Sequence, residues 1–572
     1  MNAAADQAAA AQQQAITAAA PLFVRACPGA GKTHVIVSRH LRGPAAVLRD
    51  GRALLSYTRA AAQQIRDRCH RLGRPDATGY PHYVGTLDGF LWNHLVIPHR
   101  SPERPLQLLD SWDRVNATVT LNHRTVPLSA FSFICRPGTY ADVIRRDLMP
   151  TAYLRLIQSS GRNWDDWVRQ AYTVRRDLCS RGYVTGHEAR QLALQHLDRD
   201  PGLADTLRSR FAELVVDEGQ DCSSTDVEIL DRLHEHGVPL VVVADPDQLI
   251  YGWRDADPAR LAALENKLGT TIVLDGNWRS TGPVCRLANT LRTGRRPPDI
   301  AVHTTTADPP VILLPAVFTR TGNRHLPSGR PVTDIFLQHA HQHGISPQQC
   351  LTTAHRRAHL PAAHRPNGAN TATRLAHARR VLHSATAGHD LLDSACRTGA
   401  RTLLRYWYPH LDHTSSLEDQ SIAAGLDLDT IARHAYAFLH ALPEPGPNWP
   451  KAVNQRLKDS PRPAGAAPQR TTGYLRGTAT LPPRTDDTGR PCPADNIHQV
   501  KGAEYQAVLL LVPDDDAGIR WINGDPATDE LLRTWYVAVT RAQRLLGIGI
   551  GADQLPAITE HLRDRQVPVL IG

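Results

Sequence analysis

Residues 22–33 are LFVRACPGAGKT, a short apolar run followed by a glycine-containing loop. Another apolar run, HVIV at residues 34–37, follows directly, so the order predicts strand, loop and helix. Such a loop directs backbone N–H groups at phosphates, Lys32 reaches the β- and γ-phosphate oxygens, and the Thr33 hydroxyl can bind Mg²⁺. The residues expected to surround a nucleotide here are Pro28, Gly29, Ala30, Gly31, Lys32 and Thr33.

A second segment, LVVDEGQD at residues 214–221, is an apolar strand that ends in paired carboxylates. Asp217 at the end of this strand can hold Mg²⁺ beside the phosphates. Glu218 is suited to orient and deprotonate an attacking water. A phosphate loop together with a strand-terminal Asp-Glu pair predicts hydrolysis of a nucleoside triphosphate.

A third segment, ADPDQLIYGWR at residues 244–254, follows the next apolar strand. Gln248 at its start can contact a γ-phosphate. Tyr251 and Trp253 offer flat faces on which unstacked bases can lie, an interaction of ~1–3 kcal/mol per base that tolerates any base. This segment therefore predicts a nucleic-acid contact next to the nucleotide.

Composition limits the class of protein. The chain has 572 residues and a net charge of +9, which predicts roughly three to five domains and fits a polyanionic partner only weakly. No apolar run approaches the ~18 residues that span a bilayer, and no secretory signal is evident, so no membrane association is expected. The nine cysteines are scattered without a CxxC pair, which favours a reducing, cytoplasmic location.

Two regions alternate short apolar runs with helical patterns, as α/β domains do. The first combines residues 1–92 with 205–275, and the second combines 276–368 with 488–572. The runs predict strands at 22–26, 53–57, 213–217, 239–244 and 272–274 in the first region, and at 310–315, 507–512 and 545–550 in the second.

Two segments with a different composition and pattern interrupt these regions. Residues 93–204 mix helical patterns with an extended patch around 118–135. Residues 369–487 are rich in Ala, His, Arg and Pro, and their part from 443 to 483 has enough Pro and Gly to predict a long loop or mobile segment.

The order of motifs resembles that of the UvrD/Rep/PcrA group of superfamily 1 DNA helicases. Three of these motifs are the phosphate loop, DExQD at 217–221 and DxxQxIYxWR at 245–254. The others are a Q-motif-like stretch at 12–16, SYTRAAA at 56–62, GTLDGF at 85–90, NWRS at 277–280, NIHQVKGAE at 496–504 and WYVAVTRA at 535–542.

This resemblance implies a fold and a cofactor site. The fold is α/β, with two RecA-like parallel-sheet motor domains, each interrupted by a mainly helical accessory insertion, and with ATP and Mg²⁺ in the cleft between them. It assigns catalytic roles to Lys32, Asp217, Glu218 and Gln248, with Arg279 and Arg541 as arginine fingers from the second domain. The resemblance assigns metal binding to Thr33 and Asp217.

The resemblance also assigns contacts to the rest of the nucleotide and to DNA. Gln12 is expected to recognise adenine and Glu504 to bond the ribose. His34 and Trp278 stand where the family usually has the stacking Arg and Tyr. The single-strand track is expected to include Tyr57, Thr86, Tyr251, Trp253 and His498.

The function that follows is an ATP-dependent DNA helicase or translocase that moves 3′→5′ on single-stranded DNA and acts at single/double-strand junctions, as in DNA repair. One alternative is the motor subunit of a larger complex, for example with a nuclease partner in anti-phage defence or repair. Another is a nucleotide-gated DNA-binding switch. RNA remains a further possible substrate, because stacking and phosphate contacts do not distinguish the sugars.

Overall fold

The computed structural model describes most of the chain. The residues described are 3–42, 51–100, 105–136, 139, 141–250, 256–292, 297–303, 305, 307–318, 324–325, 332–356, 359–360, 371–383, 389–409, 411, 417–446, 448–467, 474–475, 492–513 and 516–572.

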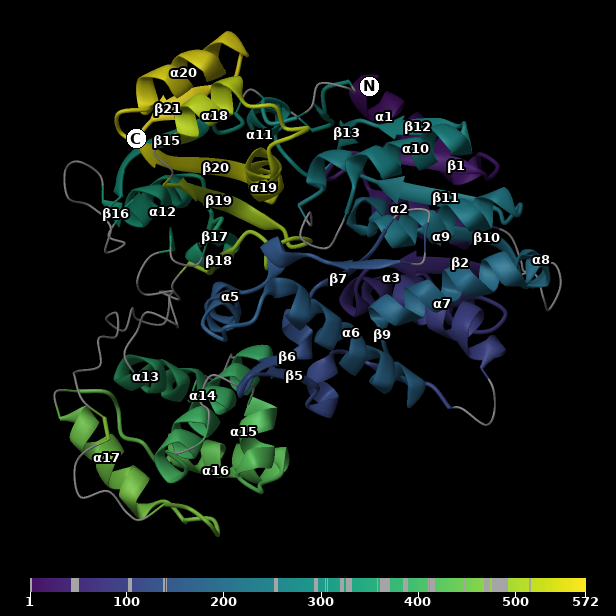
Figure 1. The fold of residues 1–572 in the computed structure, drawn as a ribbon. Coiled ribbons are helices and arrows are strands. Elements are labelled where there is room, and N and C mark those ends of the chain that lie inside the picture. The colour runs from purple at the N-terminus through teal and green to yellow at the C-terminus, as the bar shows by residue number, and fades with distance from the viewer. Residues whose placement is uncertain are drawn as a thin grey trace.

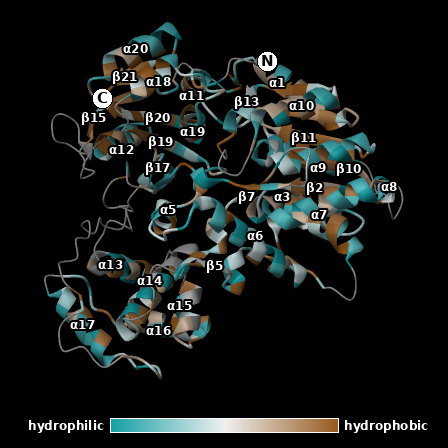
Figure 2. Ribbon diagram, in the orientation of Figure 1, coloured by the Kyte–Doolittle hydropathy of each residue, from teal (hydrophilic) through white to brown (hydrophobic). Residues whose placement is uncertain are grey.

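The first sheet has six parallel strands built from two separate parts of the chain (Figure 1). In spatial order they are β12 (Thr271–Leu274), β1 (Leu22–Ala26), β11 (Leu240–Ala244), β10 (Phe211–Val216), β2 (Gly51–Ser56) and β3 (Tyr83–Thr86). Alternate residues of one strand pack on opposite faces: Val215 joins one buried cluster, and Leu214 and Val216 join another. Both faces are thus covered, which is why most strand positions are apolar, as Figure 2 shows for β11.

Helices from distant parts of the chain cover this sheet. They are α1 (Ala3–Thr17), α2 (Lys32–His40), α3 (Arg59–Arg71), α4 (Leu87–Phe90), a π-helical turn (Leu91–Val96), α7 (Gly186–Arg199), α8 (Pro201–Arg210), α9 (Ser224–Glu235) and α10 (Pro258–Leu268). Leu194 and Leu197 of α7 and Leu207 of α8 lie in the same buried cluster as Phe211 of β10.

The second sheet has seven strands, all paired in parallel except β15 with β16. They are β16 (Arg324–His325), β15 (Val311–Phe318), β20 (Ala542–Gly551), β19 (Tyr505–Val512), β17 (Cys350–Ala354) and β18 (Ala494–Asn496), with β21 (Val569–Ile571) also paired to β15. Its helices are α11 (Gly282–Asn289), α12 (Val332–Gln342), α18 (Ala517–Asn523), α19 (Glu530–Val539) and α20 (Leu555–Asp564). The short strands β13 (Gly276–Asn277) and β14 (Ile300–Ala301) form a separate parallel pair.

The predicted α/β class with two parallel sheets is confirmed, and every strand predicted from an apolar run is present. The strands β3, β16, β17, β18 and β21 were not predicted. β16, β18 and β21 have only two or three residues each, and β3 (YVGT) and β17 (CLTTA) mix apolar residues with glycine or threonine, so no apolar run stands out.

A separate core lies between β4 (Gln107–Leu109) and β9 (Tyr183–Thr185), which pair with each other. It contains the hairpins β5 (Thr118–Leu121) with β6 (Arg124–Pro127) and β7 (Phe133–Cys135) with β8 (Asp142–Ile144), followed by α5 (Thr151–Gln158) and α6 (Trp164–Ser180). The extended patch around 118–135 is thus confirmed. The boundaries of the segment predicted at 93–204 stay a prediction, but the packing of α7 and α8 on the first sheet favours a shorter one.

A second separate core contains helices and no strand among its described residues, and it forms a group of its own in Figure 1. Its helices are α13 (Thr371–Leu382), α14 (His389–Trp407), α15 (Leu417–Ala423), α16 (Leu428–His440) and α17 (Trp449–Asp459). The prediction of a long loop over 443–483 is wrong for α17, because Trp449, Val453 and Leu457 recur every four residues and are buried in this core. None of the described helices is long and apolar enough to cross a bilayer.

One buried ion pair anchors the N-terminal helix to the first sheet. Arg39 of α2 donates from Nε and Nη2 to Glu213 of β10, at 2.8 and 2.5 Å, and from Nη1 to the Ala15 carbonyl of α1 at 2.7 Å. Both charged side chains are nearly inaccessible, so neither can exchange its partner for water.

Substituting Arg39→Met should therefore lower the free energy of unfolding by about 3–5 kcal/mol, because it leaves the Glu213 carboxylate buried without its partner. The double variant Arg39→Met/Glu213→Leu should recover part of that loss, because no unpaired charge remains. Equilibrium urea unfolding of the three proteins measures both effects. A single variant as stable as the parent would contradict the anchoring role.

Candidate active site between the two sheets

The loop between β1 and α2 has the shape of a phosphate cradle. Gly29 and Gly31 adopt the left-handed region, with φ of 77° and 80°, and Gly31 precedes α2 without any side-chain cap. The first amide groups of the helix and their partial positive charge are therefore available to an anion. Lys32 and Thr33 are the first two residues of this helix.

Residues 277–279, which precede the helix α11 of the second sheet, approach this loop closely. The Trp278 amide donates to the Gly29 carbonyl at 2.9 Å, and a Cβ atom on Gly29 would lie 2.3 Å from Asn277 Oδ1. Asn277 Oδ1 accepts from the amides of Arg279 and Ser280 at 2.8 and 2.9 Å. Asn277 thus directs the turn that carries Arg279 against the loop, a role that the sequence analysis did not assign to it.

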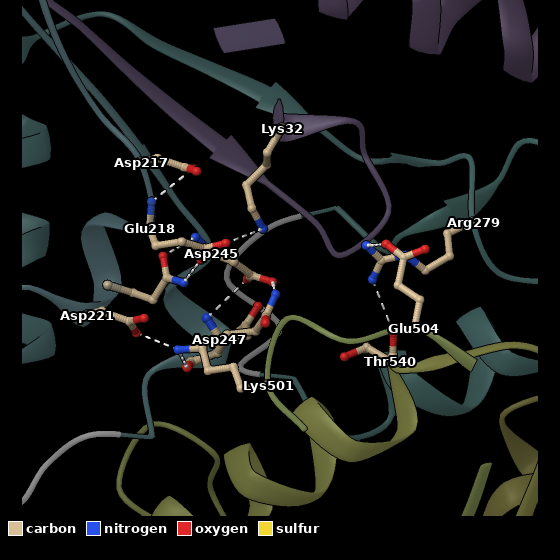
Figure 3. Close-up of polar contacts among 12 residues, drawn as sticks. Lys32, Asp217, Glu218, Asp221, Asp245, Asp247, Arg279, Lys501, Glu504 and Thr540 are labelled. Atoms are coloured by element: carbon tan, nitrogen blue, oxygen red, sulfur yellow. Dashed lines mark hydrogen bonds and ion pairs between the residues drawn. The ribbon is translucent and has the colours of Figure 1, made fainter. Parts of the chain in front are cut away.

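The paired carboxylates lie at the carboxyl end of β10. Glu218 has a left-handed backbone, with φ of 54°, its amide donates to Asp217 Oδ1 at 3.0 Å, and its carboxylate lies 3.9 Å from Lys32 Nζ (Figure 3). Burial, followed by the charge of Glu218, raises the pKa of Asp217 to about 7. Burial would also raise the pKa of Glu218, but the charges of Lys32 and Lys501 hold it below its ordinary value.

Gln248 links the two sheets across the cavity. Its Nε2 donates to Asp245 Oδ2 at 2.7 Å, and its Oε1 accepts from Nη2 of Arg541, just after α19, at 3.2 Å. Arg541 is buried, and this burial, followed by the charge of Arg279, lowers its pKa to about 10. The guanidinium therefore stays protonated at neutral pH.

Two more cations face carboxylates in the same region (Figure 3). Lys501 Nζ lies 2.5 Å from Asp221 Oδ1 and 3.5 Å from the Gln248 carbonyl, and thus joins the second sheet to the first. Arg279 forms an ion pair with Glu504, which also accepts from Gln543 Nε2 at 3.1 Å.

The opposite end of the site holds planar side chains. Gln12 Nε2 donates to the Ala30 carbonyl at 2.8 Å, so α1 contacts the loop directly. The exposed His34 ring lies 3.4 Å from both Arg68 Nη2 and Ser38 Oγ. Trp278, on the side of the second sheet, packs edge to face against His303.

One cavity of about 660 Å³ brings most of these residues together, a volume typical of small-molecule sites. The predicted nucleotide residues that line it are Pro28, Gly29, Gly31, Lys32, Thr33, His34, Asp217, Glu218, Gln248, Trp278, Arg279, Glu504 and Arg541. Gln12 and Ala30 contact each other at its edge.

The residues predicted on the DNA track are not gathered in the same way. Tyr57 lines the cavity just described. Thr86 caps α4, accepting from the Gly89 amide at 3.1 Å, and the ring of His498 lies 5.9 Å from that of His355. Tyr251 and Trp253 lie outside the described residues. The DNA contacts of all five stay predictions.

Several cavity residues were missed by sequence reasoning. Asp221 and Lys501 lie inside recognised motifs, and their opposite charges were a usable signal. The sequence contains no comparable signal for Arg68, because it is one of many arginines. It lies on an amphipathic helix whose other face packs on the sheet. Its contact with the site depends on how α3 lies beside α2.

The residues present fit a nucleoside triphosphate with a divalent cation. Added Cβ atoms at Gly29 and Gly31 would meet Asn277 and Gln12, so both positions require glycine, and the loop has the positive φ angles typical of a phosphate-binding backbone. Thr33 and Asp217 supply the hydroxyl and carboxylate oxygens that Mg²⁺ prefers. The cationic side chains that line the same cavity suit a polyanion, and they are Lys32, Arg68, Arg279, Lys501 and Arg541.

Comparison with known proteins agrees with this geometry. Residues 8–118 and 144–269 match the model of the UvrD/REP helicase N-terminal domain. The matched region contains the phosphate loop, the paired carboxylates and Gln248, that is, the contribution of the first sheet to the cavity.

Individual relatives match about half of the chain. ATP-dependent DNA helicase PcrA of Bacillus subtilis is 25% identical over 287 residues, which cover 49% of this chain and 38% of the relative. DNA helicase II of Escherichia coli is 28% identical over 296 residues, covering 49% and 39%. A shorter stretch of 99 residues is 34% identical to the RecBCD enzyme subunit RecB of Borreliella burgdorferi, covering 16% and 8%. The matches thus span less than half of each relative's length. The part of the chain that contains the first sheet is thus similar to the N-terminal domain of UvrD/REP helicases.

Proposed function

We propose that this chain is an ATP-dependent DNA helicase or translocase of the UvrD type, which hydrolyses ATP to move 3′→5′ on single-stranded DNA and to unwind or remodel duplexes. One observation carries the proposal: Lys32, Asp217 and Glu218 from the first sheet face Arg279 and Arg541 from the second sheet across a single cavity. Hydrolysis at such a site depends on how the two sheets sit against each other, which is what a motor requires.

In this mechanism the amides at the start of α2 and the Lys32 ammonium bind the phosphates of ATP. Thr33 and Asp217 would hold Mg²⁺, which when bound neutralises charge on the phosphate oxygens. Glu218 acts as general base: its lowered pKa keeps it ionised at neutral pH, so it can accept a proton from the attacking water. Arg279 and Arg541 stabilise the negative charge that develops on the transferred phosphoryl group.

At the far end of the cavity, His34 and Trp278 would hold the adenine, Gln12 would recognise its edge and Glu504 would bond the ribose. Glu504 is also the ion-pair partner of Arg279. We expect a bound ribose to compete for this carboxylate, which would free Arg279 to turn toward the phosphates.

The two sheets would be RecA-like motor domains, comprising residues 1–92 with 205–275 and residues 276–368 with 488–572. Each would carry an accessory insertion, at 93–204 and 369–487. The pairing of β4 with β9 supports an inner boundary for the first insertion, near residues 105 and 185. Tyr57, Thr86, Tyr251, Trp253 and His498 remain the proposed contacts to single-stranded DNA.

A second candidate function is the motor component of a larger complex with a nuclease. The local similarity to RecB favours it, as does a similar stretch in one component of the ATP-dependent helicase/nuclease of Lactococcus lactis, at 36% identity over 104 residues. Unwinding of DNA, or translocation on single strands, by the purified chain alone would favour the first proposal, whereas ATPase activity without either would favour the second.

Substituting Glu218→Gln should abolish ATP hydrolysis with little effect on ATP binding, because it removes the base and retains the size of the side chain. We expect kcat to fall by a factor of ~10²–10⁴. Steady-state ATPase assays with and without single-stranded DNA measure this effect, and Glu560→Gln, at an exposed position of α20, is the matched control. The proposed function fails if the parent protein hydrolyses ATP no faster than Glu218→Gln under either condition.

Substituting Gly29→Ala should weaken ATP binding by about tenfold or more, which corresponds to ~1.4 kcal/mol or more. Its Cβ atom would collide with Asn277 Oδ1 and push the second domain away from the phosphate loop. Gly73→Ala is a matched control, because Gly73 has a similar φ of 74° but nothing within 4 Å of the added atom. Titration with a fluorescent ATP analogue tests the pair, and equal affinity losses would show that the collision with Asn277 is not the cause.

A further inference from the structure

The turn that carries Gln248 is held by one buried carboxylate. In this turn, directly after β11, the Gln248 amide donates to the Asp245 carbonyl at 2.9 Å and the Asp247 amide donates to Asp245 Oδ1 at 3.2 Å. The Gln248 side chain donates to the other carboxylate oxygen, Asp245 Oδ2, at 2.7 Å. Asp245, Asp247 and Gln248 are all buried. The position of the Gln248 side-chain amide therefore depends on the position of the Asp245 carboxylate.

Arg292, three residues after α11 ends, binds this turn from the second part of the chain. Its Nε donates to Asp247 Oδ2 at 3.2 Å, and its Nη1 donates to Asp299 Oδ1 at 2.9 Å. The same guanidinium donates to Asn289 Oδ1 at 2.7 Å and to the Pro297 carbonyl at 2.9 Å. Arg292, Asp247 and Asp299 each have a side chain no more than 4% exposed.

Tyr536 of α19 completes the connection. Its hydroxyl lies 3.3 Å from Asp299 Oδ2 and 3.5 Å from Asp245 Oδ2. The polar contacts thus form a closed ring, which we call the interdomain ring: Asp245, Asp247, Arg292, Asp299 and Tyr536. Tyr536 lies on the helix that leads to Arg541, and Arg541 bonds the Oε1 atom of Gln248.

The charged groups of this ring make the position of the Gln248 turn dependent on Arg292. Removing Arg292 would take from Asp247 and Asp299 the guanidinium that they share, and the two buried carboxylates would then shift toward their remaining donors. This change would shift the turn that carries Gln248. A hydrophobic contact could give the same stability, but it would not set the direction of the Gln248 amide.

We propose that Arg292 is a positioning residue for ATP hydrolysis, which acts through the interdomain ring to keep Gln248 in register with Arg541. This inference rests on the proposed function. Arg292 and Asp299 lie outside every motif recognised in the sequence, and neither lines the nucleotide cavity. Arg292 should therefore affect the rate of the chemical step and not the binding of ATP.

The first test is Arg292→Gln in the full chain, with steady-state ATPase assays in the presence of single-stranded DNA. We expect kcat to fall by about tenfold or more, since small displacements of catalytic groups have effects of this size, while the KM for ATP changes less than about twofold. Arg286→Gln, at an exposed position of α11, is the matched control and should retain parental kcat. Unchanged kcat in Arg292→Gln would overturn the proposal.

The second test asks whether Arg292 acts through Gln248. If it does, Gln248→Ala and the double variant Gln248→Ala/Arg292→Gln should have the same kcat, because the group that Arg292 positions is already absent. A merely structural role predicts instead that the two losses multiply. That multiplication would also overturn the proposal.

Tyr536→Phe provides a test that does not depend on the folding of Arg292→Gln. It removes one hydroxyl from the ring and keeps the aromatic side chain that packs in the core. We expect a lower kcat with unchanged KM, and parental kcat would overturn the proposal. A parent protein without ATPase activity would instead contradict the proposed function, so the two failures are distinguishable.

Discussion

The close approach of Gly29 to Asn277 is the constraint on which the site depends. The two backbones are in direct contact, through the hydrogen bond from the Trp278 amide to the Gly29 carbonyl, and no side chain fits between them. Because Asn277 also accepts from the Arg279 and Ser280 amides, this contact determines where Arg279 lies. Glycine at position 29 is therefore required twice, by its positive φ and by the proximity of the second part of the chain.

Opposite charges are paired throughout the cavity. Lys501 faces Asp221 and joins the second sheet to the first, whereas Lys32 faces Glu218 within the first region and Arg279 faces Glu504 within the second. In a partly buried site, opposite charges at these distances stabilise each other more than they would in water. We expect a polyanion that enters the cavity to compete with these carboxylates for the cations, so binding and domain arrangement would be coupled.

The chain divides its apolar residues among separate cores. Each large sheet has buried clusters on both faces, while the segment between β4 and β9 and the helices α13–α17 have clusters of their own. Composition suggested this division, but the limits of each core depend on packing: α7 and α8 look like any amphipathic helices in the sequence, and only their contact with the first sheet assigns them to it. Similarly, α17 lies in a Pro-rich stretch, and its buried face shows that it belongs to the helical core.

Local sequence was sufficient for the α/β class, for the strands with strong apolar runs and for the phosphate loop, because continuous burial on two faces and positive φ impose residue types that are visible within a few positions. It also identified most residues that line the cavity, since each motif carries its own chemistry. The tertiary structure alone decided which groups meet. Asn277 at Gly29, Arg68 at His34, Lys501 at Asp221 and Arg292 at Asp247 are contacts between residues separated by tens to hundreds of positions. Such contacts follow from strand order and from the packing of the two sheets, and no short window of sequence contains that information.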